Sequence, residues 1–330
     1  MQENRLGNSS LSLTKVGFGS WAIGGGDWQF GWGDQDEQEA VDAIVAAVDV
    51  GINWIDTAAV YGGGRSEEIV GKALQVLGPT RRPIVATKCG RVMRSPTQID
   101  KVLKRDSIIA ECEGSLRRLG IDCIDLYQLH WPEPDEDIEE GWQTLVDLKS
   151  QGKVREIGVS NHSVAQMQRL QAIHPIASLQ PPYSMLKRDI EASILPFCGQ
   201  HNIGVICYSP MQKGLLSGKF TLQRAQSLSD KDHRSRDPNF QSPLLDAHLG
   251  LVDCLRPLAD KHSMSVAQLA IAWVLRRPEM TAAIVGARRP DQIAETAAAS
   301  SLELTAQEQE TIEQLLAGHQ QAMLRANLAS

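Results

Sequence analysis

The sequence predicts an α/β fold of the (β/α)8 TIM-barrel type, and three observations support this prediction. Short, nearly continuous apolar runs recur along the 330 residues, as expected for parallel strands that are buried on both faces. Amphipathic segments of helical length lie between these runs. Eight such strand–helix pairs, at about 40 residues each, match the chain length. We therefore interpret residues 1–330 as a single barrel domain.

The strands are predicted where short apolar runs, many of them rich in β-branched residues, interrupt a more polar sequence. Runs of this kind are too short for helices and lack the strict alternation of a half-exposed strand. In chain order they are Val16–Ser20, Ile52–Asp56, Ile84–Lys88, Cys123–Leu129, Glu156–Ser160, Ala177–Gln180, Gly204–Ser209 and Ala282–Val285.

The helices are predicted where apolar residues recur every three or four positions and so form one apolar face. In the first helix, Val41, Ile44 and Val48 give this repeat. Ser163 and Ser265 precede two other helices and are predicted N-caps. The predicted helices are Glu37–Asp49, Ser66–Leu77, Lys104–Leu119, Ile138–Ser150, Val164–Ala172, Glu191–His201, Val266–Arg276 and Asp291–Ala299.

Three further segments are added to the predicted barrel. Residues 5–14, R-L-G-N-S-S-L-S-L-T, are typical of a β-hairpin with a Gly-Asn turn that closes the barrel bottom. A long insertion, about 212–262, follows the seventh strand, where we expect extra helices and a lid or a disordered segment over Gln223–Ser242. A tail helix is predicted over Thr305–Ala317, because T-A-Q-E fits a capping box.

A doubly wound parallel sheet is the alternative architecture. It would show fewer strand–helix units, and dinucleotide-binding members carry G-x-G-x-x-G after the first strand. The sequence has eight units and lacks that motif. No linker or low-complexity stretch divides the chain, which also favours the barrel.

Composition and charge narrow the class of function. The net charge of −7 and a pI near 5.7, without a basic stripe, argue against nucleic-acid binding. The chain has no run of 18 apolar residues and no signal-peptide core at its start, so we expect a cytoplasmic protein without membrane contact. The six cysteines form no CxxC pair, and we expect neither a disulfide framework nor a metal site. We expect a monomer, with a weak homo-oligomer as the alternative.

Four polar residues stand at or just past the ends of three successive predicted strands. Asp56 and Tyr61 follow the second strand, Lys88 ends the third, and His130 follows the fourth. Side chains at the carboxyl ends of barrel strands converge on one site. A phenol with a pKa near 10 needs a nearby cation to act as an acid at neutral pH, and a lysine held by an aspartate supplies one. The set suits a carbonyl reductase.

The alternative interpretations of these four residues are a structural ion pair, a metal-dependent hydrolase and a lyase. An isolated Asp–Lys pair is more often structural than catalytic. A metal-dependent hydrolase would need several His and Asp ligands at the strand ends, and the only histidines near that face are His130 and His162. A lyase could use Lys88 as a Schiff base, but it would leave Tyr208 at the seventh strand without a role.

Five sequence runs stand in a specific order along essentially the whole chain: G-I-N-W-I-D-T-A-A-V-Y-G-G-G-R-S-E-E-I-V-G-K-A-L, L-Y-Q-L-H-W-P, G-K-V-R-E-I-G-V-S-N-H, L-Q-P-P-Y-S and V-I-C-Y-S-P-M-Q-K-G-L-L-S-G-K. In order and spacing they resemble the aldo-keto reductase family, in a bacterial branch near the stress-protein and potassium-channel β-subunit-like members. The resemblance implies NADPH bound across the barrel mouth. Tyr61 would be the general acid, its pKa lowered by Lys88, which pairs with Asp56. His130 would orient the carbonyl.

The resemblance also implies a set of cofactor contacts at the ends of strands five to seven. Ser160, Asn161 and Gln180 would hydrogen-bond the nicotinamide carboxamide, and Tyr208 would stack under the ring. The glycine-containing run after Tyr208 would clasp the pyrophosphate, with lysine supplying charge. Its members are Ser209, Pro210, Lys213, Gly214 and Leu215.

The run after the eighth strand decides the cofactor preference. Many family members bind the 2′-phosphate of NADPH with a lysine where this chain has Gly286. Arg288 is the expected substitute, because a guanidinium can grip phosphate with two N–H groups. Gln292 is expected to contact the adenosine. The family often has Glu-Asn in the following helix, whereas here Glu295 precedes Thr296.

Tryptophans are expected to form the substrate pocket. Trp21, Trp28, Trp32 and Trp131 lie near the predicted mouth and suit a small aldehyde or ketone. The rival function is an NADPH-binding regulatory module with little turnover, because channel β-subunit-like relatives act mainly through a partner protein. The intact set of four polar residues favours an enzyme.

Overall fold

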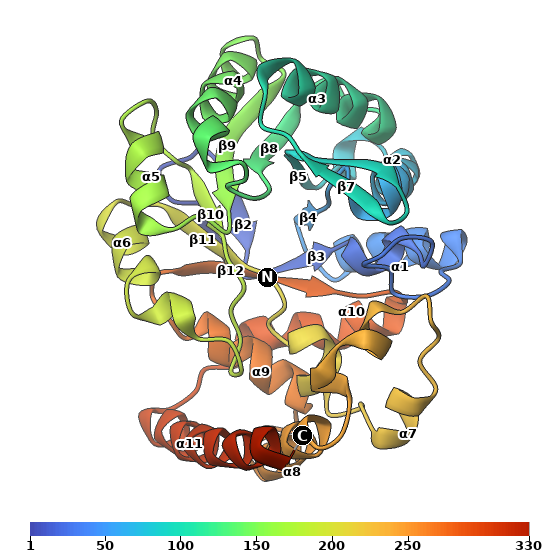
Figure 1. Cartoon of the computed structure of the whole chain (residues 1–330), viewed down its shortest axis with the longest axis vertical. Coiled ribbons are helices and arrows are strands. Elements are labelled where there is room, and N and C mark those ends of the chain that lie inside the picture. The colour runs from blue at the N-terminus through green and yellow to red at the C-terminus, as the bar shows by residue number, and fades with distance from the viewer. Residues whose placement is uncertain (330) are drawn as a thin grey trace.

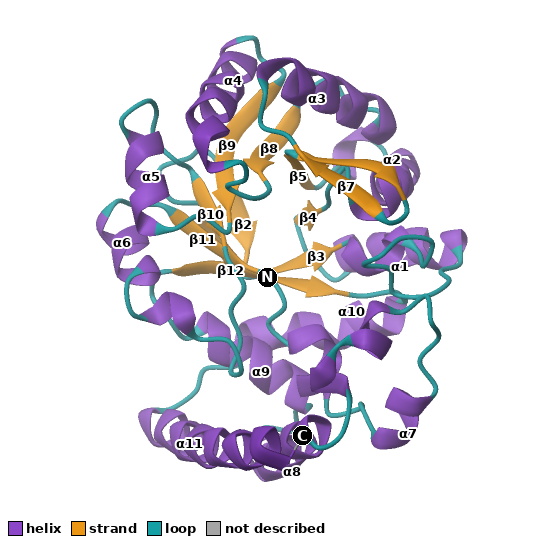
Figure 2. Cartoon of the chain, in the orientation of Figure 1, coloured by secondary structure: helices purple, strands orange, loops and turns teal. Residues whose placement is uncertain are grey.

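The structure, a computed structural model, describes residues 1–329, and in this part of the chain eight parallel strands form a closed barrel. Each strand pairs with the barrel strands before and after it in the sequence. The predicted (β/α)8 barrel is therefore confirmed, and the doubly wound sheet is excluded (Figure 2). The strands are β3 Val16–Gly19, β4 Trp54–Asp56, β5 Ile84–Cys89, β8 Ile124–Leu129, β9 Val154–Ser160, β10 Ser178–Gln180, β11 Gly204–Cys207 and β12 Met280–Gly286.

Helices surround the barrel and cover the outer faces of its strands (Figure 1). The two predicted serine N-caps are confirmed, because the hydroxyls of Ser163 and Ser265 accept hydrogen bonds from the third residue of their helices. The helices are α1 Glu37–Asp49, α2 Arg65–Leu77, α3 Arg105–Leu119, α4 Ile138–Ser150, α5 Val164–Gln171, α6 Ile194–Gln200, α9 Val266–Leu275 and α10 Pro290–Ala297.

Two predicted boundaries differ from the structure for local backbone reasons. Helix α6 begins three residues later than predicted, because Ser193 has a non-helical φ of −139°. Strand β11 ends two residues earlier, at Cys207, because Ser209 adopts a φ of 55° that no strand allows. The other predicted ends of the eight strands and eight helices lie within two residues of the observed ones.

The predicted hairpin at the barrel bottom is confirmed. Strands β1 Glu3–Arg5 and β2 Ser12–Thr14 pair antiparallel. Leu6, Leu11 and Leu13 are almost fully buried and pack in one cluster with Trp54 and other side chains from inside the barrel. The hairpin therefore fills the lower end of the barrel and leaves the opposite end, where the strands terminate, for a site.

The insertion after β11 contains the extra helices that were predicted. It comprises the 3-10 segments Gln212–Ser217, His233–Arg236 and Pro238–Phe240 and the helices α7 Leu222–Gln226 and α8 Leu244–Lys261.

The tail helix is longer than predicted. Its capping box is confirmed, because Thr305 Oγ1 accepts from the Glu308 backbone N–H and Glu308 Oε2 accepts from that of Thr305. The helix, α11 Ala306–Ala329, continues past Ala317 because it packs along α8, where His319 bonds His248. None of the described helices, α11 included, is long and apolar enough to cross a membrane.

A second hairpin, between β5 and α3, was not predicted. Strand β6 Arg91–Ser95 pairs with β7 Gln98–Lys101 across a turn at Pro96. The signal was weak, because Val92, Met93 and Ile99 are few among polar neighbours. Figure 1 shows this hairpin next to α2, and it adds a wall to the mouth of the barrel.

Candidate active site

A buried ion pair joins the ends of β4 and β5. Lys88 Nζ lies 2.8 Å from Asp56 Oδ2 and donates to the Thr57 carbonyl oxygen at 2.7 Å. The same ammonium lies 3.3 Å from the Tyr61 hydroxyl. Lys88 is 1% exposed and Asp56 is 3% exposed, so each charge depends on its partner. The pairing of Asp56 with Lys88, and the approach of Lys88 to Tyr61, are as expected from the sequence.

Burial dominates the pKa values of these groups. Loss of water raises the pKa of Asp56 and lowers that of Lys88, and the attraction between the two charges opposes both shifts. Burial, and then the negative charge of Asp56, raise the pKa of Tyr61 well above 10. The net shift of the Tyr61 pKa is therefore upward, whereas the resemblance implied a pKa lowered by Lys88. Tyr61 keeps its proton at neutral pH.

His130 follows β8, and its backbone N–H donates to the Cys89 carbonyl oxygen at 3.0 Å. Its ring meets that of Tyr61 edge-on, with 5.8 Å between the ring centres. Burial, followed by the charges of Lys88 and Arg91, lowers the pKa of His130 well below 6.5. The imidazole is therefore neutral at neutral pH, and it can donate one hydrogen bond without carrying charge.

The residues predicted to bind a carboxamide form a hydrogen-bonded chain behind the ion pair. Gln180 Nε2 donates to Asp56 Oδ1 at 2.8 Å, and Ser160 Oγ donates to the Gln180 carbonyl oxygen at 2.8 Å. Asn161 Nδ2 donates to Ser160 Oγ at 2.9 Å, and Tyr208 donates to Asn161 Oδ1 at 2.9 Å. The four side chains therefore stand together at the ends of β9, β10 and β11.

The run after Tyr208 bends sharply along the cavity. Ser209 and Lys213 both have a φ of 55°, and Gly214 has a φ of 97°, so the backbone turns toward the barrel mouth. Lys213 Nζ pairs with Asp237 Oδ2 of the insertion at 2.9 Å. Ser209, Pro210, Lys213 and Gly214 line the cavity. The side chain of Leu215 does not, because it is buried among Phe220, Phe240 and Leu245, a packing that no pattern in the sequence indicates.

Arg288 stands at the far end of the cavity and already has partners. Its Nε donates to Gln35 Oε1 at 2.6 Å, and Nη1 donates to the Trp32 carbonyl oxygen at 2.8 Å. Nη2 donates to the carbonyl oxygen of Asp34. Two of its five N–H groups remain for a ligand. Gly286 and Gln292 also line the cavity, and Gln292 Oε1 accepts from the Arg288 backbone N–H at 2.8 Å.

Aromatic side chains line the other wall, and part of that wall was not foreseen. Trp21, Trp28, Trp32 and Trp131 all line the cavity. The insertion contributes His233, which stacks on Trp21 at 5.0 Å between ring centres. No pattern in the sequence of the insertion indicates that His233 lies among the tryptophans.

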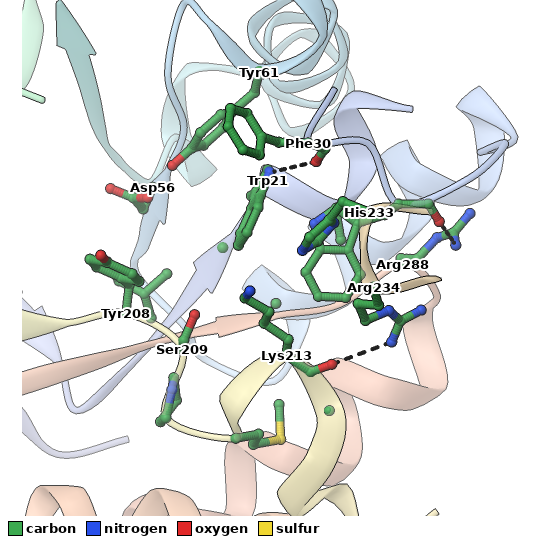
Figure 3. A pocket seen from close by; sticks show the side chains of 18 of the residues that line it. Trp21, Phe30, Asp56, Tyr61, Tyr208, Ser209, Lys213, His233, Arg234 and Arg288 are labelled. Atoms are coloured by element: carbon green, nitrogen blue, oxygen red, sulfur yellow. Dashed lines mark hydrogen bonds between the residues drawn. The ribbon is translucent and has the colours of Figure 1, made fainter. Parts of the chain in front are cut away.

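These residues surround one cavity of about 910 Å³. In Figure 3, Asp56, Tyr61 and Tyr208 lie on one side of it, and His233, Arg234 and Arg288 lie on the other. The cavity therefore reaches from the ion pair at β4 and β5 to the start of α10. Within residues 1–329, no group of three or more His, Cys, Asp or Glu side chains is arranged to hold a metal ion.

Comparison with known proteins identifies the family. The sequence model of the Aldo/keto reductase family matches residues 15–317. The aldo-keto reductase YhdN of Bacillus subtilis is 38% identical over 96% of this chain and 94% of its own length. The NADH-specific methylglyoxal reductase of Escherichia coli is 34% identical over 92% and 95%, respectively.

Solved structures agree with the sequence relatives. The glycerol dehydrogenase AKR11B4 of Gluconobacter oxydans is 39% identical, with a TM-score of 0.85 over 96% of this chain and 95% of that one. An aldo/keto reductase of Klebsiella pneumoniae, in complex with NADP and acetate, is 28% identical, with a TM-score of 0.71 over 96% of both chains. The chain therefore belongs to the aldo/keto reductase family.

Proposed function

We propose that the protein is an NADPH-dependent reductase of small aldehydes and ketones, with Tyr61 as the general acid. The observation that carries the proposal is the approach of Lys88 Nζ to within 3.3 Å of the Tyr61 hydroxyl, with Asp56 holding the ammonium from the other side. The group opens onto a cavity with an aromatic wall, which suits a small carbonyl compound.

The raised pKa of Tyr61 is compatible with an acid. A phenol that stays protonated at neutral pH can donate to a carbonyl oxygen as negative charge develops there. The phenolate that results lies beside the Lys88 ammonium, which stabilises it in a site of low dielectric. The neutral His130 donates a second hydrogen bond to the same oxygen and so orients the carbonyl.

The residues of this chain fit a nicotinamide dinucleotide. Polar side chains of Ser160, Asn161 and Gln180 stand at one end of the cavity, and Tyr208 presents a ring there. NADPH, when bound, supplies the hydride for the carbonyl carbon. Relatives with a nicotinamide cofactor support the assignment, since the Klebsiella pneumoniae structure contains NADP.

A cluster of arginines supports NADPH over NADH. Arg224, Arg234 and Arg288 line the cavity, and the pKa of Arg288 is lowered by burial and by the charge of Arg234. A 2′-phosphate would relieve this repulsion, and NADH has no such group. The Escherichia coli relative is NADH-specific by name, so the two cofactors must be compared directly.

The test is Tyr61→Phe, assayed by NADPH oxidation with p-nitrobenzaldehyde, methylglyoxal and glyceraldehyde. We expect kcat to fall about 100-fold or more, because general acid catalysis contributes that much, while NADPH affinity is nearly unchanged. Tyr127→Phe is the matched control, because Tyr127 is buried and lies outside the cavity. Retention of more than about a tenth of the wild-type rate by Tyr61→Phe would exclude Tyr61 as the acid.

A further inference from the structure

A charged cluster lines the cavity near His130, and the proposed reaction does not use it. Arg91 begins β6 and Lys101 ends β7, and the two residues stand opposite each other in the hairpin. Glu133 lies in the loop after β8, three residues past His130. All three side chains line the cavity.

Arg91 is the buried member of this cluster. Its Nη2 donates to Glu133 Oε2 at 2.5 Å, and Lys101 Nζ lies 2.9 Å from the same oxygen. The Arg91 side chain is 10% exposed, against 42% for Glu133 and 58% for Lys101. Its guanidinium also lies 5.7 Å from the centre of a Trp131 ring. Arg91 is therefore fixed in place by its contacts, while Lys101 is at the rim.

The cluster carries an excess positive charge. One carboxylate faces two cations, which leaves a formal charge of +1. Neighbouring groups do not neutralise it, because Asp56 and Lys88 balance each other and His130 is uncharged. The positive field of this cluster reaches the place where the carbonyl would bind.

One nitrogen of Arg91 has no partner. Its Nη1 is buried and makes no hydrogen bond to any described residue. A buried guanidinium nitrogen without an acceptor is unfavourable, and most buried polar groups in proteins are paired. Nη1 has less than 1 Å² of accessible surface, so a ligand oxygen reaches it only after a neighbouring side chain moves. The ligand oxygen would then satisfy its N–H groups and also meet the excess charge.

We propose that Arg91 determines specificity by binding a carboxylate of the substrate, so that the preferred substrates are small oxo acids. This inference rests on the reductase function proposed above and adds the substrate class. A carboxylate fits because its single charge matches the excess, and because an arginine stays charged and offers directed N–H groups to it. The aldehyde or ketone of the same molecule then lies toward Tyr61 and His130.

The experiment compares two substrates that differ in charge, 4-oxobutanoate and its methyl ester, by the ratio of their kcat/KM values. We expect the wild-type protein to favour the acid, and Arg91→Met to lower the ratio about 10- to 100-fold, mainly through the KM of the acid, since hydrogen bonds to charged groups have that effect. Arg94→Met is the matched control, because Arg94 is on the same hairpin, pairs with Asp100 and does not line the cavity. Its ratio should equal that of the wild type.

A second variant moves the ratio in the opposite direction. Glu133→Gln removes the carboxylate that competes for Arg91 and Lys101, so the preference for the acid should rise. An unchanged ratio in both Arg91→Met and Glu133→Gln would refute the inference, provided that the ester and p-nitrobenzaldehyde are reduced.

Direct binding separates this inference from the proposed reaction. If none of the aldehydes is reduced, the reductase function fails, and NMR titration with butanoate and butanamide still tests Arg91. Binding of butanoate to the wild type, with loss in Arg91→Met, supports the carboxylate site. Equal binding of butanoate by the two proteins, or equal affinity for butanoate and butanamide, overturns it.

Discussion

The buried pair of Lys88 and Asp56 gives a sharp prediction for Asp56→Asn. The side chain keeps its size, but Lys88 loses its only short carboxylate contact among the described residues. The amide oxygen of the variant can still accept from Lys88, and Gln180 can turn its own amide to match the new N–H group. Hydrogen bonds are therefore retained, and the change isolates the effect of the lost charge.

The magnitude follows from burial. Removing one partner of a buried ion pair costs about 3–5 kcal/mol, because the other charge stays in a site of low dielectric. An unfolding entropy of about 2.1 cal/mol/K per residue amounts to about 0.7 kcal/mol/K for a chain of this length. The melting temperature should therefore fall by about 4–7 °C.

The pH dependence has a definite sign. In the variant, the unfolded chain holds the Lys88 proton up to the ordinary lysine pKa of 10.5, whereas the buried Lys88, whose pKa is already lowered in the wild type, releases it at lower pH. The unfolded state then binds more protons, so the free energy of unfolding rises with pH below 10.5. The free energy of unfolding that Asp56→Asn loses relative to the wild type should therefore become smaller as the pH rises toward 10.5.

Denaturant unfolding and calorimetry of three variants complete the test. Asp56→Asn should be inactive and destabilised, and so should Lys88→Met, which leaves the carboxylate unpaired. The double variant should recover most of the stability, because a pair of neutral groups replaces a buried pair at little cost, and it should remain inactive. A double variant that loses as much stability as the two single ones added together would refute this account of the pair.

Two further predictions concern other parts of the structure. Arg288→Gln should weaken NADPH binding more than NADH binding, about 10-fold or more for a lost phosphate contact, and equal losses measured by fluorescence titration would mean that Arg288 only fastens the loop of Trp32 and Asp34. Glu111 accepts from the Gly90 N–H, and burial raises its pKa to about 7. The folded state then binds more protons than the unfolded one between pH 4.5 and about 7, so stability decreases as pH rises through this window, by about 3 kcal/mol at most. Glu111→Gln should lack that decrease in chemical denaturation, and an unchanged pH profile would rule out Glu111 as its source.

The sequence predicted the site best where residues stand at the ends of barrel strands, because the order of the strands then determines which residues meet. Asp56 and Lys88 stand at the ends of neighbouring apolar runs, and parallel strands in a barrel bring such residues together whatever the loops do. The same logic places Gln180, which bonds Asp56 from a strand across the barrel. These contacts depend on the order of the strands and on the residue at which each apolar run ends, and both can be located in the sequence.

The features that could not be predicted from the sequence depend on how deeply a side chain is buried and on the paths of irregular loops. The cation near Tyr61 was predicted, but the net direction of the pKa shift was predicted as downward whereas it is upward, because the degree of burial comes from the whole packed site. Arg288 was expected to bind the 2′-phosphate, and its bonds to carbonyl oxygens in a loop more than 250 residues away were not foreseen. Leu215 packs in a small apolar core formed by the insertion, and no local sequence pattern predicts that core.

The chain of hydrogen bonds from Tyr208 through Asn161, Ser160 and Gln180 to Asp56 has a consequence for ligand affinity. Its donors and acceptors already bond one another, so a ligand amide that binds there must exchange existing bonds for new ones. The net enthalpy of such an exchange is small. For the proposed cofactor, we therefore predict that the amide contacts select which face of the nicotinamide ring is presented. Tight binding is then expected to come from buried apolar surface and from the arginines at the far end of the cavity.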